Sequence, residues 1–357
     1  MKKIIIVLIA IGCAYGASLV YQQLTLSVPI STVLPIQNKA ITTHIDKAQN
    51  SFSMTTNNSA ISIQARYPTA SNVEINHQFA YILNSNSTTI SKCDINQSSG
   101  QLENCSNVGR GFNAPTGIAI TKNHLWLYVT NRGENNVSIC QIESQSGELV
   151  NCHYTDSQQF NNPTGITLDE INNIAYVTNV ANNSLSRCTI NPSNMGLINC
   201  IQYKNQTFDY PTDIKLNINN ANLFIVNAGN NSITKCKFNE DQQQLDCSAV
   251  LDNLSEPQAI FFTRNNVYIP NRASKLITRC SSQLQDNHFT NCTNFAGDFT
   301  NVTDIATGDT HRKIYITDEQ KVSVCEEMNA TATLNCHLTG SGFNSPSGLY
   351  LLNEKQA

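Results

Sequence analysis

Twelve of the thirteen cysteines fall into six pairs, and the spacing within each pair suits disulfide chemistry. The two members of a pair are 11 or 12 residues apart, and successive pairs begin 44 to 48 residues apart. A hairpin between two such cysteines brings their Cβ atoms within disulfide distance. Zinc fits less well, because the chain has no Cys-x-x-Cys and its seven histidines share no position in the pattern. We predict six disulfides: Cys93–Cys105, Cys140–Cys152, Cys188–Cys200, Cys236–Cys247, Cys280–Cys292 and Cys325–Cys336.

Each predicted disulfide would hold together the two outermost strands of a repeated unit. Around Cys188, a turn at 191–196 folds the chain back, which places Cys188 opposite Cys200 and Ile190 opposite Ile198. The outermost strand has a free edge and little core behind it, so without a staple it would fray or pair with another molecule. On the chain-entropy model, each closed loop of this size contributes about 2–3 kcal/mol to the free energy of unfolding.

Two carboxylates interrupt a glycine position of the repeat. The Pro-Thr-Gly turns at 115–117 and 163–165 become Pro-Thr-Asp at 211–213, and Asp304 takes the same place in another copy. Inner strands begin at these turns, so the carboxylates are expected at one mouth of a central channel, where they could bind a cation or a polar ligand. The alternative is that each aspartate caps its own turn through its side chain, which is the commoner role of this residue.

Loops that follow the second strand of each copy form another group of candidates. They differ in charge between copies, as at 132–135, 180–183, 272–275 and 318–321, although the strands around them stay alike. Variable loops on a constant scaffold are a usual place for binding specificity, and drift in unconstrained turns is the plainer explanation. Together the two groups give five candidate binding residues: Asp213, Asp304, Arg132, Glu134 and Arg272. With no phosphate loop and no nucleophile elbow, we predict no catalytic residue, no metal and no cofactor.

These residues must be positioned by a repeat of four short strands. A turn with a short apolar strand, as at 115–120, precedes a strand that ends in Asn, as at 128–131, and the third and fourth strands carry the two cysteines. Alternation with a period of two, with Gly, Asn, Pro and Ser between the strands, predicts antiparallel β-structure without helices. Four strands in a period of forty-odd residues are typical of a β-propeller blade.

The Pro-Thr-Gly turn at 163–165, the Tyr-Val-Thr-Asn strand at 176–179 and the following Asn-Asn-Ser at 182–184 resemble YVTN-type β-propeller repeats, which are close to NHL repeats. The resemblance covers roughly residues 68–352. It implies a ring of six or seven blades, often in the periplasm or at bacterial surfaces, in a superfamily with lactonase-like and streptogramin-lyase-like enzymes. No set of His and acidic residues here matches the catalytic positions of those enzymes, and the paired cysteines are not part of the general family pattern.

The number of blades depends on how the ring closes. Six explicit copies lie between residues 68 and 342, and residues 343–352 repeat the turn and first strand of a further copy. A lone inner strand would leave two open edges, so we expect the N-terminus to complete it. Counting back one period places the missing strands at about 33–66, which favours seven blades with the last closed by 33–66 and 343–352. Six blades with an N-terminal arm is the alternative, and in either case residues 17–357 are predicted to form one all-β domain.

Residues 1–16 are predicted to be a signal peptide. Lys2 and Lys3 precede an apolar run at 4–11, and Ala14 and Gly16 are the small residues that cleavage after Gly16 requires. The run is shorter than the ~20 residues of a membrane-spanning helix, so we expect no integral membrane protein. A periplasmic or secreted bacterial protein is predicted, and the alternative is a lipoprotein that is anchored through Cys13.

The charge and composition of the chain restrict the classes of partner that it is expected to bind. Charged residues make up 13% of the chain and the net charge is −4, so nucleic acid is not expected as a partner. We predict an exported scaffold that binds a protein, peptide or glycan through one face of the ring. The alternative is a hydrolase or lyase that acts on a lactone or cyclic ester in the channel, for which Asp213, Asp304 and Glu256 are the candidate groups. The oligomeric state is left open.

Overall fold

The computed structural model describes residues 42–46, 51–56, 59–63, 78–155, 160–217, 221–283, 288–308, 313–328 and 331–352. The chain divides into two compact units, residues 1–73 and 74–357. In the first unit, β1 (Thr42–Asp46), β2 (Ser51–Thr56) and β3 (Ser59–Ile63) form an antiparallel meander. The predicted signal peptide and Cys13 lie outside the described residues.

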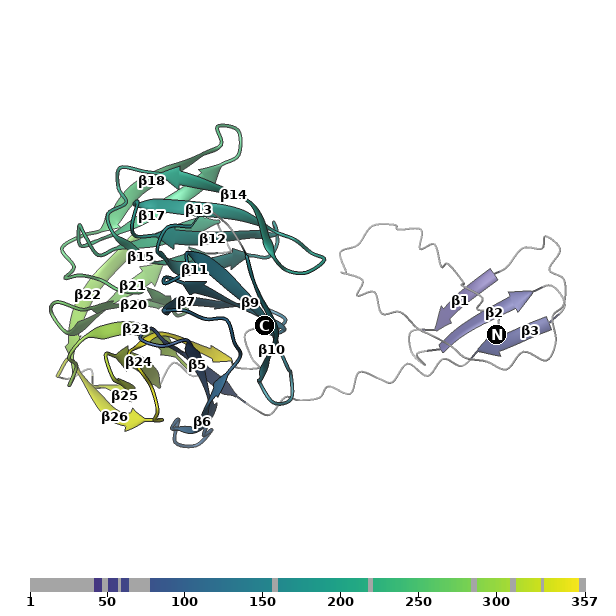
Figure 1. Ribbon diagram of the computed structural model, residues 1–357, viewed down its shortest axis with the longest axis horizontal. Coiled ribbons are helices and arrows are strands. Elements are labelled where there is room, and N and C mark those ends of the chain that lie inside the picture. Colours follow the sequence, from purple (N-terminus) through teal and green to yellow (C-terminus); the bar gives the residue numbers. More distant parts are fainter. Residues whose placement is uncertain are drawn as a thin grey trace. The chain divides into compact units, whose positions relative to one another are not determined.

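Four-stranded antiparallel blades make up the second unit (Figure 1). From the inside outward, the first blade contains β27 (Pro346–Leu352), β4 (Phe79–Asn84), β5 (Thr89–Ile95) and β6 (Leu102–Val108). The second contains β7 (Pro115–Ile120), β8 (Trp126–Asn131), β9 (Asn136–Ile142) and β10 (Leu149–Thr155). The third contains β11 (Pro163–Asp169), β12 (Ile174–Asn179), β13 (Ser184–Ile190) and β14 (Leu197–Lys204).

The remaining blades follow the same order. The fourth contains β15 (Pro211–Asn217), β16 (Asn222–Asn227), β17 (Ser232–Asn239) and β18 (Gln244–Leu251). The fifth contains β19 (Phe261–Phe262), β20 (Asn266–Asn271), β21 (Leu276–Gln283) and β22 (His288–Ala296). The sixth contains β23 (Val302–Thr307), β24 (Ile314–Asp318), β25 (Lys321–Met328) and β26 (Thr333–Thr339), and a single parallel bridge between Ala296 and Thr333 links its outer strand to that of the fifth.

Inner strands contact one another around the ring, with β7 against β11 and β27, β11 against β15, and β23 against β27. The prediction of an all-β propeller with four-stranded antiparallel blades is therefore confirmed. Within the described residues the blades number six, which agrees with the alternative count and not with the favoured count of seven.

The chain closes the ring with its own last strand, but not where the sequence suggested. Strand β27 pairs with β4, so that Leu352 lies opposite Phe79 and Pro346 opposite Asn84. Strands β1 to β3 pair with one another, and among the described residues β27 pairs with β4 and not with the strands that were expected at 33–66. The final turn and strand supply the inner strand of the blade that contains β4. The described residues of the second unit therefore form six complete blades.

A belt of hydroxyl groups joins the starts of the inner strands. In five of the six described blades the second residue of the turn donates to the carbonyl oxygen of the next turn: Thr116 to Pro163 (3.0 Å), Thr164 to Pro211 (2.8 Å), Thr212 to Pro257 (3.2 Å), Thr303 to Pro346 (2.8 Å) and Ser347 to Pro115 (2.8 Å). In the fifth blade Gln258 holds this position, and its amide donates to the carbonyls of Glu256 and Pro257 in its own turn. Because the belt passes from the sixth blade directly to the first, it belongs to a six-blade ring.

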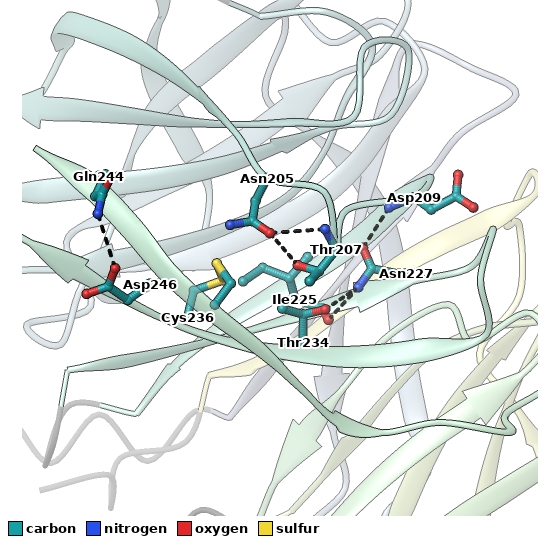
Figure 2. Close-up of a disulfide and its surroundings, with 10 residues drawn as sticks. Asn205, Thr207, Asp209, Ile225, Asn227, Thr234, Cys236, Gln244 and Asp246 are labelled. Atoms are coloured by element: carbon teal, nitrogen blue, oxygen red, sulfur yellow. Dashed lines mark hydrogen bonds between the residues drawn. A yellow bond between two sulfur atoms is a disulfide. The ribbon is translucent and has the colours of Figure 1, made fainter.

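The residue that ends the second strand of each blade anchors the loop before the first strand. Its side-chain oxygen accepts a backbone N–H at 2.9–3.1 Å in every blade, in the pairs Asn84–Asn344, Asn131–Asn113, Asn179–Asn161, Asn227–Asp209, Asn271–Ser255 and Asp318–Thr300. Figure 2 shows this arrangement in the fourth blade, where Asn227 also donates to Thr234. Because these side chains are buried and fully engaged, their recurrence reflects the fold.

All six predicted disulfides are present, with Cα–Cα distances of 4.0–4.1 Å. The spacing of 11 or 12 residues has a structural cause. In the 11-residue pairs the cysteines lie directly opposite each other, as Cys236 and Cys247 do. In the 12-residue pairs the register shifts at the disulfide, and the residue before the second cysteine is an Asn with φ of 50–51°: Asn104, Asn151, Asn199 and Asn291.

This bulge corrects one expected register. Thr189, not Ile190, lies opposite Ile198, and Ile190 pairs with Leu197. Asn tolerates the left-handed conformation better than other residues with a side chain, which explains why it recurs at the extra position. The disulfide pairing itself is unaffected, because the shift restores the approach of the two sulfur atoms.

Apolar cores lie between neighbouring blades. One cluster combines Tyr81 and Leu83 of the first blade with Leu127 and Val129 of the second. The tyrosines of the second strands also reach across these seams, because the hydroxyl of Tyr81 donates to the carbonyl of Gly147 at 2.7 Å. Tyr128 and Tyr315 make the same bond to Met195 and Gly100 in their neighbouring blades.

Candidate functional site

The inner strands surround a cavity of about 700 Å³. All six contribute to its wall, through Gly117 of β7, Gly165 of β11, Asp213 of β15, Phe261 of β19, Asp304 of β23 and Leu349 of β27. Three residues from loops at one end of the blades line the same cavity: Arg132 and Arg272 directly follow the second strands β8 and β20, and Tyr210 directly precedes β15. We call the end of the cavity that these three residues line the mouth.

Four of the five candidate residues from the sequence meet in this cavity. Asp213 and Asp304 lie on its wall, and Arg132 and Arg272 lie at its mouth. Glu134 is not part of the lining, and its carboxylate accepts from the amides of Asn113 (3.2 Å) and Asn136 (3.4 Å). That any of the five binds a ligand stays a prediction.

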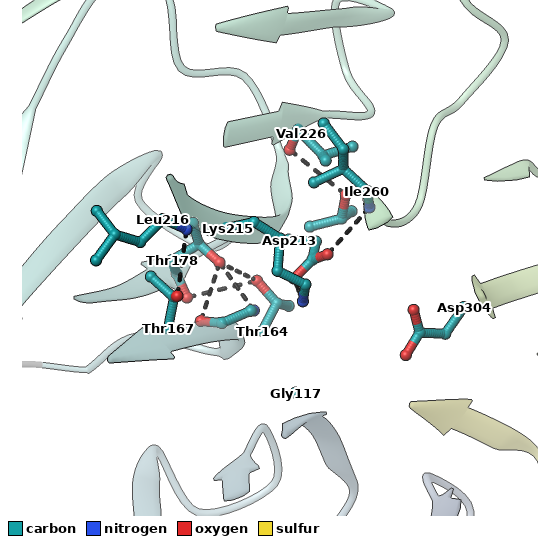
Figure 3. A network of polar contacts seen from close by, with 12 residues as sticks. Gly117, Thr164, Thr167, Thr178, Asp213, Lys215, Leu216, Val226, Ile260 and Asp304 are labelled. Atoms are coloured by element: carbon teal, nitrogen blue, oxygen red, sulfur yellow. Dashed lines mark hydrogen bonds and ion pairs between the residues drawn. The ribbon is translucent and has the colours of Figure 1, made fainter. Parts of the chain in front are cut away.

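Lys215 is a member of the site that the sequence analysis missed (Figure 3). Its Nζ lies 3.2 Å from Oδ1 of Asp213, two residues earlier on the same strand. The available signal was its replacement of Ala119 and Thr167, which hold the equivalent place in the second and third blades. Burial alone would lower the pKa of the Lys215 ammonium, but the carboxylates of Asp213 and Asp304 outweigh this and hold that pKa above its usual value.

The buried carboxylate of Asp213 connects the fourth blade to the fifth through a hydrogen bond. Its Oδ2 accepts the backbone N–H of Ile260, in the inner segment of the fifth blade, at 3.1 Å. Figure 3 shows the carboxylate between this N–H and Lys215. Asp213 therefore bonds across the seam to the next blade, and does not cap its own turn as the sequence alternative supposed.

Asp304 accepts one hydrogen bond from the neighbouring blade and one from its own turn. Its Oδ2 accepts the backbone N–H of Leu349 in the closing strand β27 at 2.7 Å, and its Oδ1 accepts that of Ile305 in its own turn at 2.8 Å. Burial raises the pKa of this carboxyl from its usual 3.8 to about 7. Lys215 and the two N–H donors lower the pKa, whereas Asp213 raises it, and burial dominates the balance.

Glycine at the same position lets neighbouring inner strands approach closely. A Cβ atom on Gly117 would lie 1.9 Å from the carbonyl oxygen of Thr164, and one on Gly165 would lie 2.6 Å from Cα of Asp213. No side chain fits there unless the strands move apart. The exchange of Gly for Asp along the repeat thus changes how two inner strands are joined, from direct backbone packing to a carboxylate that accepts an N–H.

At the mouth, the two arginines have different partners. Arg272 forms an ion pair with Glu256, with 3.0 Å between Nε and Oε2. Arg132 donates from Nη2 to the neutral hydroxyl of Tyr210 at 3.0 Å. Among the described residues Arg132 has no carboxylate within ion-pair distance. Its positive charge therefore lines the cavity without a carboxylate partner among the described side chains.

Within the part of the chain that the structure describes, no three His, Cys, Asp or Glu side chains gather closely enough to hold a metal ion. The same residues include no helix with the length and apolarity to cross a bilayer. The six disulfides indicate an oxidising environment.

Comparison with known proteins gives a family match and many similar folds. The model of the family described as Lactonase, 7-bladed beta-propeller, matches residues 36–168 and, in an overlapping second match, 69–207. Comparison with curated protein sequences gives no match. The family description names seven blades, whereas the described residues of this chain form six.

Solved structures show the same fold at low identity. The nidogen/laminin complex contains a chain with a TM-score of 0.61 and 11% identity, over 77% of this chain and 98% of that one. A putative 6-phosphogluconolactonase from Bacteroides fragilis gives 0.57 and 14%, over 78% and 99%. The periplasmic gluconolactonase of Pseudomonas aeruginosa gives 0.56 and 9%, over 77% and 99%. Together with the repeats, these matches identify the chain as a β-propeller repeat protein similar to the lactonase-like and NHL/YVTN propellers.

Proposed function

We propose that this protein is an exported scaffold that binds a protein, peptide or glycan partner through the mouth of its channel. The observation that carries the proposal is the state of Arg132, a cation that lines the cavity and has only the hydroxyl of Tyr210 as a partner among the described residues. A charge that the fold does not neutralise is available to a polar ligand. Arg272 lies at the same end and is paired with a half-exposed Glu256, which a ligand could replace as the partner of the guanidinium.

The use of the channel carboxylates supports binding over catalysis. Both oxygens of Asp213 are engaged, one by Lys215 and one by the N–H of Ile260. The bond from Ile260 joins two blades and the pair with Lys215 lies within β15, and neither requires a substrate. The similar folds include both a complex of two proteins and lactonases, so the fold by itself favours neither function.

Export is part of this proposal. Six disulfides form and persist in oxidising compartments, which for a bacterial protein are the periplasm and the cell exterior. The predicted leader at 1–16 agrees with such a location, and an anchor through Cys13 would place the same propeller at a membrane surface.

Charge reversal at the mouth tests the binding proposal. We expect the protein to bind members of peptide and glycan arrays, and the double variant Arg132→Glu, Arg272→Glu to lose this binding by about tenfold or more. The matched control is Lys237→Glu on the outer half of the fourth blade, which is exposed. Lys92, an alternative outer-strand position, is a poor control because its Nζ packs over Phe79 and donates to Ser146. Unchanged binding by the double variant, or lost binding by the control alone, would contradict the proposal.

A second function has one observation in its favour. The carboxyl of Asp304, with its pKa near 7, faces a cavity and is suited to accept a proton at neutral pH. Such a group could activate water for the hydrolysis of a lactone. We expect this activity to rise as the pH passes through 7, because the carboxylate is the active form. Hydrolysis of gluconolactone followed by pH-stat would then be lost in Asp304→Asn, and a rate equal to that of the variant would exclude the idea.

A further inference from the structure

Among the described residues, Asp304 and Arg132 line the cavity without an oppositely charged side chain within ion-pair distance, as do Lys122 and Glu170 beyond the ends of β7 and β11. Deep in the wall, Asp213 has Lys215 as its partner at 3.2 Å, whereas Asp304 accepts only backbone N–H groups, from Leu349 and Ile305. In the described part of the chain, no Lys, Arg or His lies within ion-pair distance of Asp304. With all three groups ionised, this part of the wall carries one net negative charge.

The mouth has the opposite balance. Arg272 is neutralised by Glu256, and Arg132 bonds to the uncharged Tyr210. One net positive charge is left at the end of the cavity that these residues line. Since Arg132 and Asp304 both line the same cavity of about 700 Å³, a bound molecule can reach both.

We propose that the channel binds a dipolar ligand with an ammonium group and a carboxylate, such as an amino acid or the end of a peptide. Its ammonium pairs with Asp304, and its carboxylate pairs with Arg132, whose guanidinium can donate two parallel hydrogen bonds. This inference rests on the proposed function and names the chemistry of the ligand at the same mouth.

The arrangement suits an ammonium better than a divalent metal. Calcium takes six to eight oxygen ligands and magnesium an octahedral set, whereas the two oxygens of Asp304 already accept N–H groups and Asp213 is held by Lys215. An ammonium needs only the remaining lone pairs of one carboxylate. Apolar side chains such as Ile118, Ile166 and Leu349 also line the cavity, so a hydrocarbon spacer between the charged ends would meet apolar surface.

Linear amino acids of increasing length test the proposal. We would titrate the full protein by calorimetry and ligand-observed NMR with γ-aminobutyrate, ε-aminohexanoate and ω-aminooctanoate, and with hexanoate and hexylamine as singly charged controls. At pH 8, where Asp304 is ionised, at least one amino acid is expected to bind about tenfold more tightly than both controls. Equal affinity for amino acids and singly charged controls, or no binding of any probe, would overturn the inference.

Variants separate the two ends of the ligand. Asp304→Asn should remove the advantage of the amino acid over hexanoate, and Arg132→Gln should remove its advantage over hexylamine, each by about fivefold or more. Asp298→Asn and Lys237→Gln change one charge elsewhere and should leave both advantages intact, and thermal melts confirm that all variants are folded. If both advantages survive in both site variants, the assignment is wrong. The array experiment tests the proposed function independently of this inference. A large partner can require Arg132 at the mouth without placing a dipolar group in the channel.

Discussion

Deletion of residues 343–357 is expected to prevent the propeller from folding stably. The deletion removes β27, which exposes the inner edge of β4 and takes the buried Leu349, Leu351 and Leu352 out of the cores on either side. Burial of three leucines alone contributes about 5–9 kcal/mol. The melting temperature should fall by more than about 10 °C, or the protein should fail to accumulate in the medium or periplasm. Thermal unfolding followed by circular dichroism measures the effect.

A shorter deletion provides the control. Removing only residues 353–357 keeps the bonds of β27 to the other described residues, among them those from Leu349 to Asp304 and from Ser347 to Pro115. Its melting temperature should match that of the full chain. If the long deletion melts like the short one, β27 is an appendage, and the closure of the ring by β4 and β27 does not support the fold.

Replacement of Asp304 by Asn is expected to stabilise the protein above neutral pH. The folded carboxyl has its pKa raised to about 7, so between pH 4 and 7 the folded state holds a proton that the unfolded state has released. Stability from this group is therefore present below pH 4 and is lost as the pH rises to 7. The loss is at most about 1.4 kcal/mol per pH unit, and less where the channel admits solvent.

Asn keeps the shape and one acceptor for the N–H of Leu349 but carries no charge. We expect Asp304→Asn to melt several degrees higher than the natural protein at pH 8 and within a degree or two of it at pH 4. Asp298→Asn, at a fully exposed position, removes the same charge and should show no such pH-dependent difference. If the two substitutions behave alike, or if Asp304→Asn destabilises the protein at pH 8, the raised pKa is not a property of the folded channel.

The sequence predicted those features that depend on spacing along one blade. Paired cysteines at 11 or 12 residues have few partners within reach other than each other, and all six disulfides followed from this. The extra residue of the longer pairs was not interpreted as a bulge from the sequence, so Ile190 was wrongly expected opposite Ile198. The conformation of Asn199 could not be predicted either, because a positive φ at Asn is one of several ways to absorb an insertion.

Features that depend on contacts between blades could not be predicted in the same way. The partner of β27 lies some 260 residues earlier in the chain, as the pairs of Asn344 with Asn84 and of Ser345 with Ser85 show. The repeat alone favoured a closure with seven blades over one with six. Asp213 and Asp304 were found because they break a glycine pattern. Lys215 was missed because its position is variable in the repeat. That it lines the same cavity as Asp213 and Asp304 becomes evident only when the inner strands surround the channel.

The seam between β4 and β27 has a mechanical consequence. Because Phe79 lies opposite Leu352, the ring is entered and left at the same end of one strand pair. A force that pulls these two points apart would load the hydrogen bonds of the seam one after another, as in a zipper, and would not shear them together. Once the seam has opened, each disulfide still prevents its loop of 11 or 12 residues from extending. An extended residue adds roughly 3.3–3.6 Å to the length of a chain. The propeller should therefore yield at low force, and each blade should lengthen by less than it would without its disulfide.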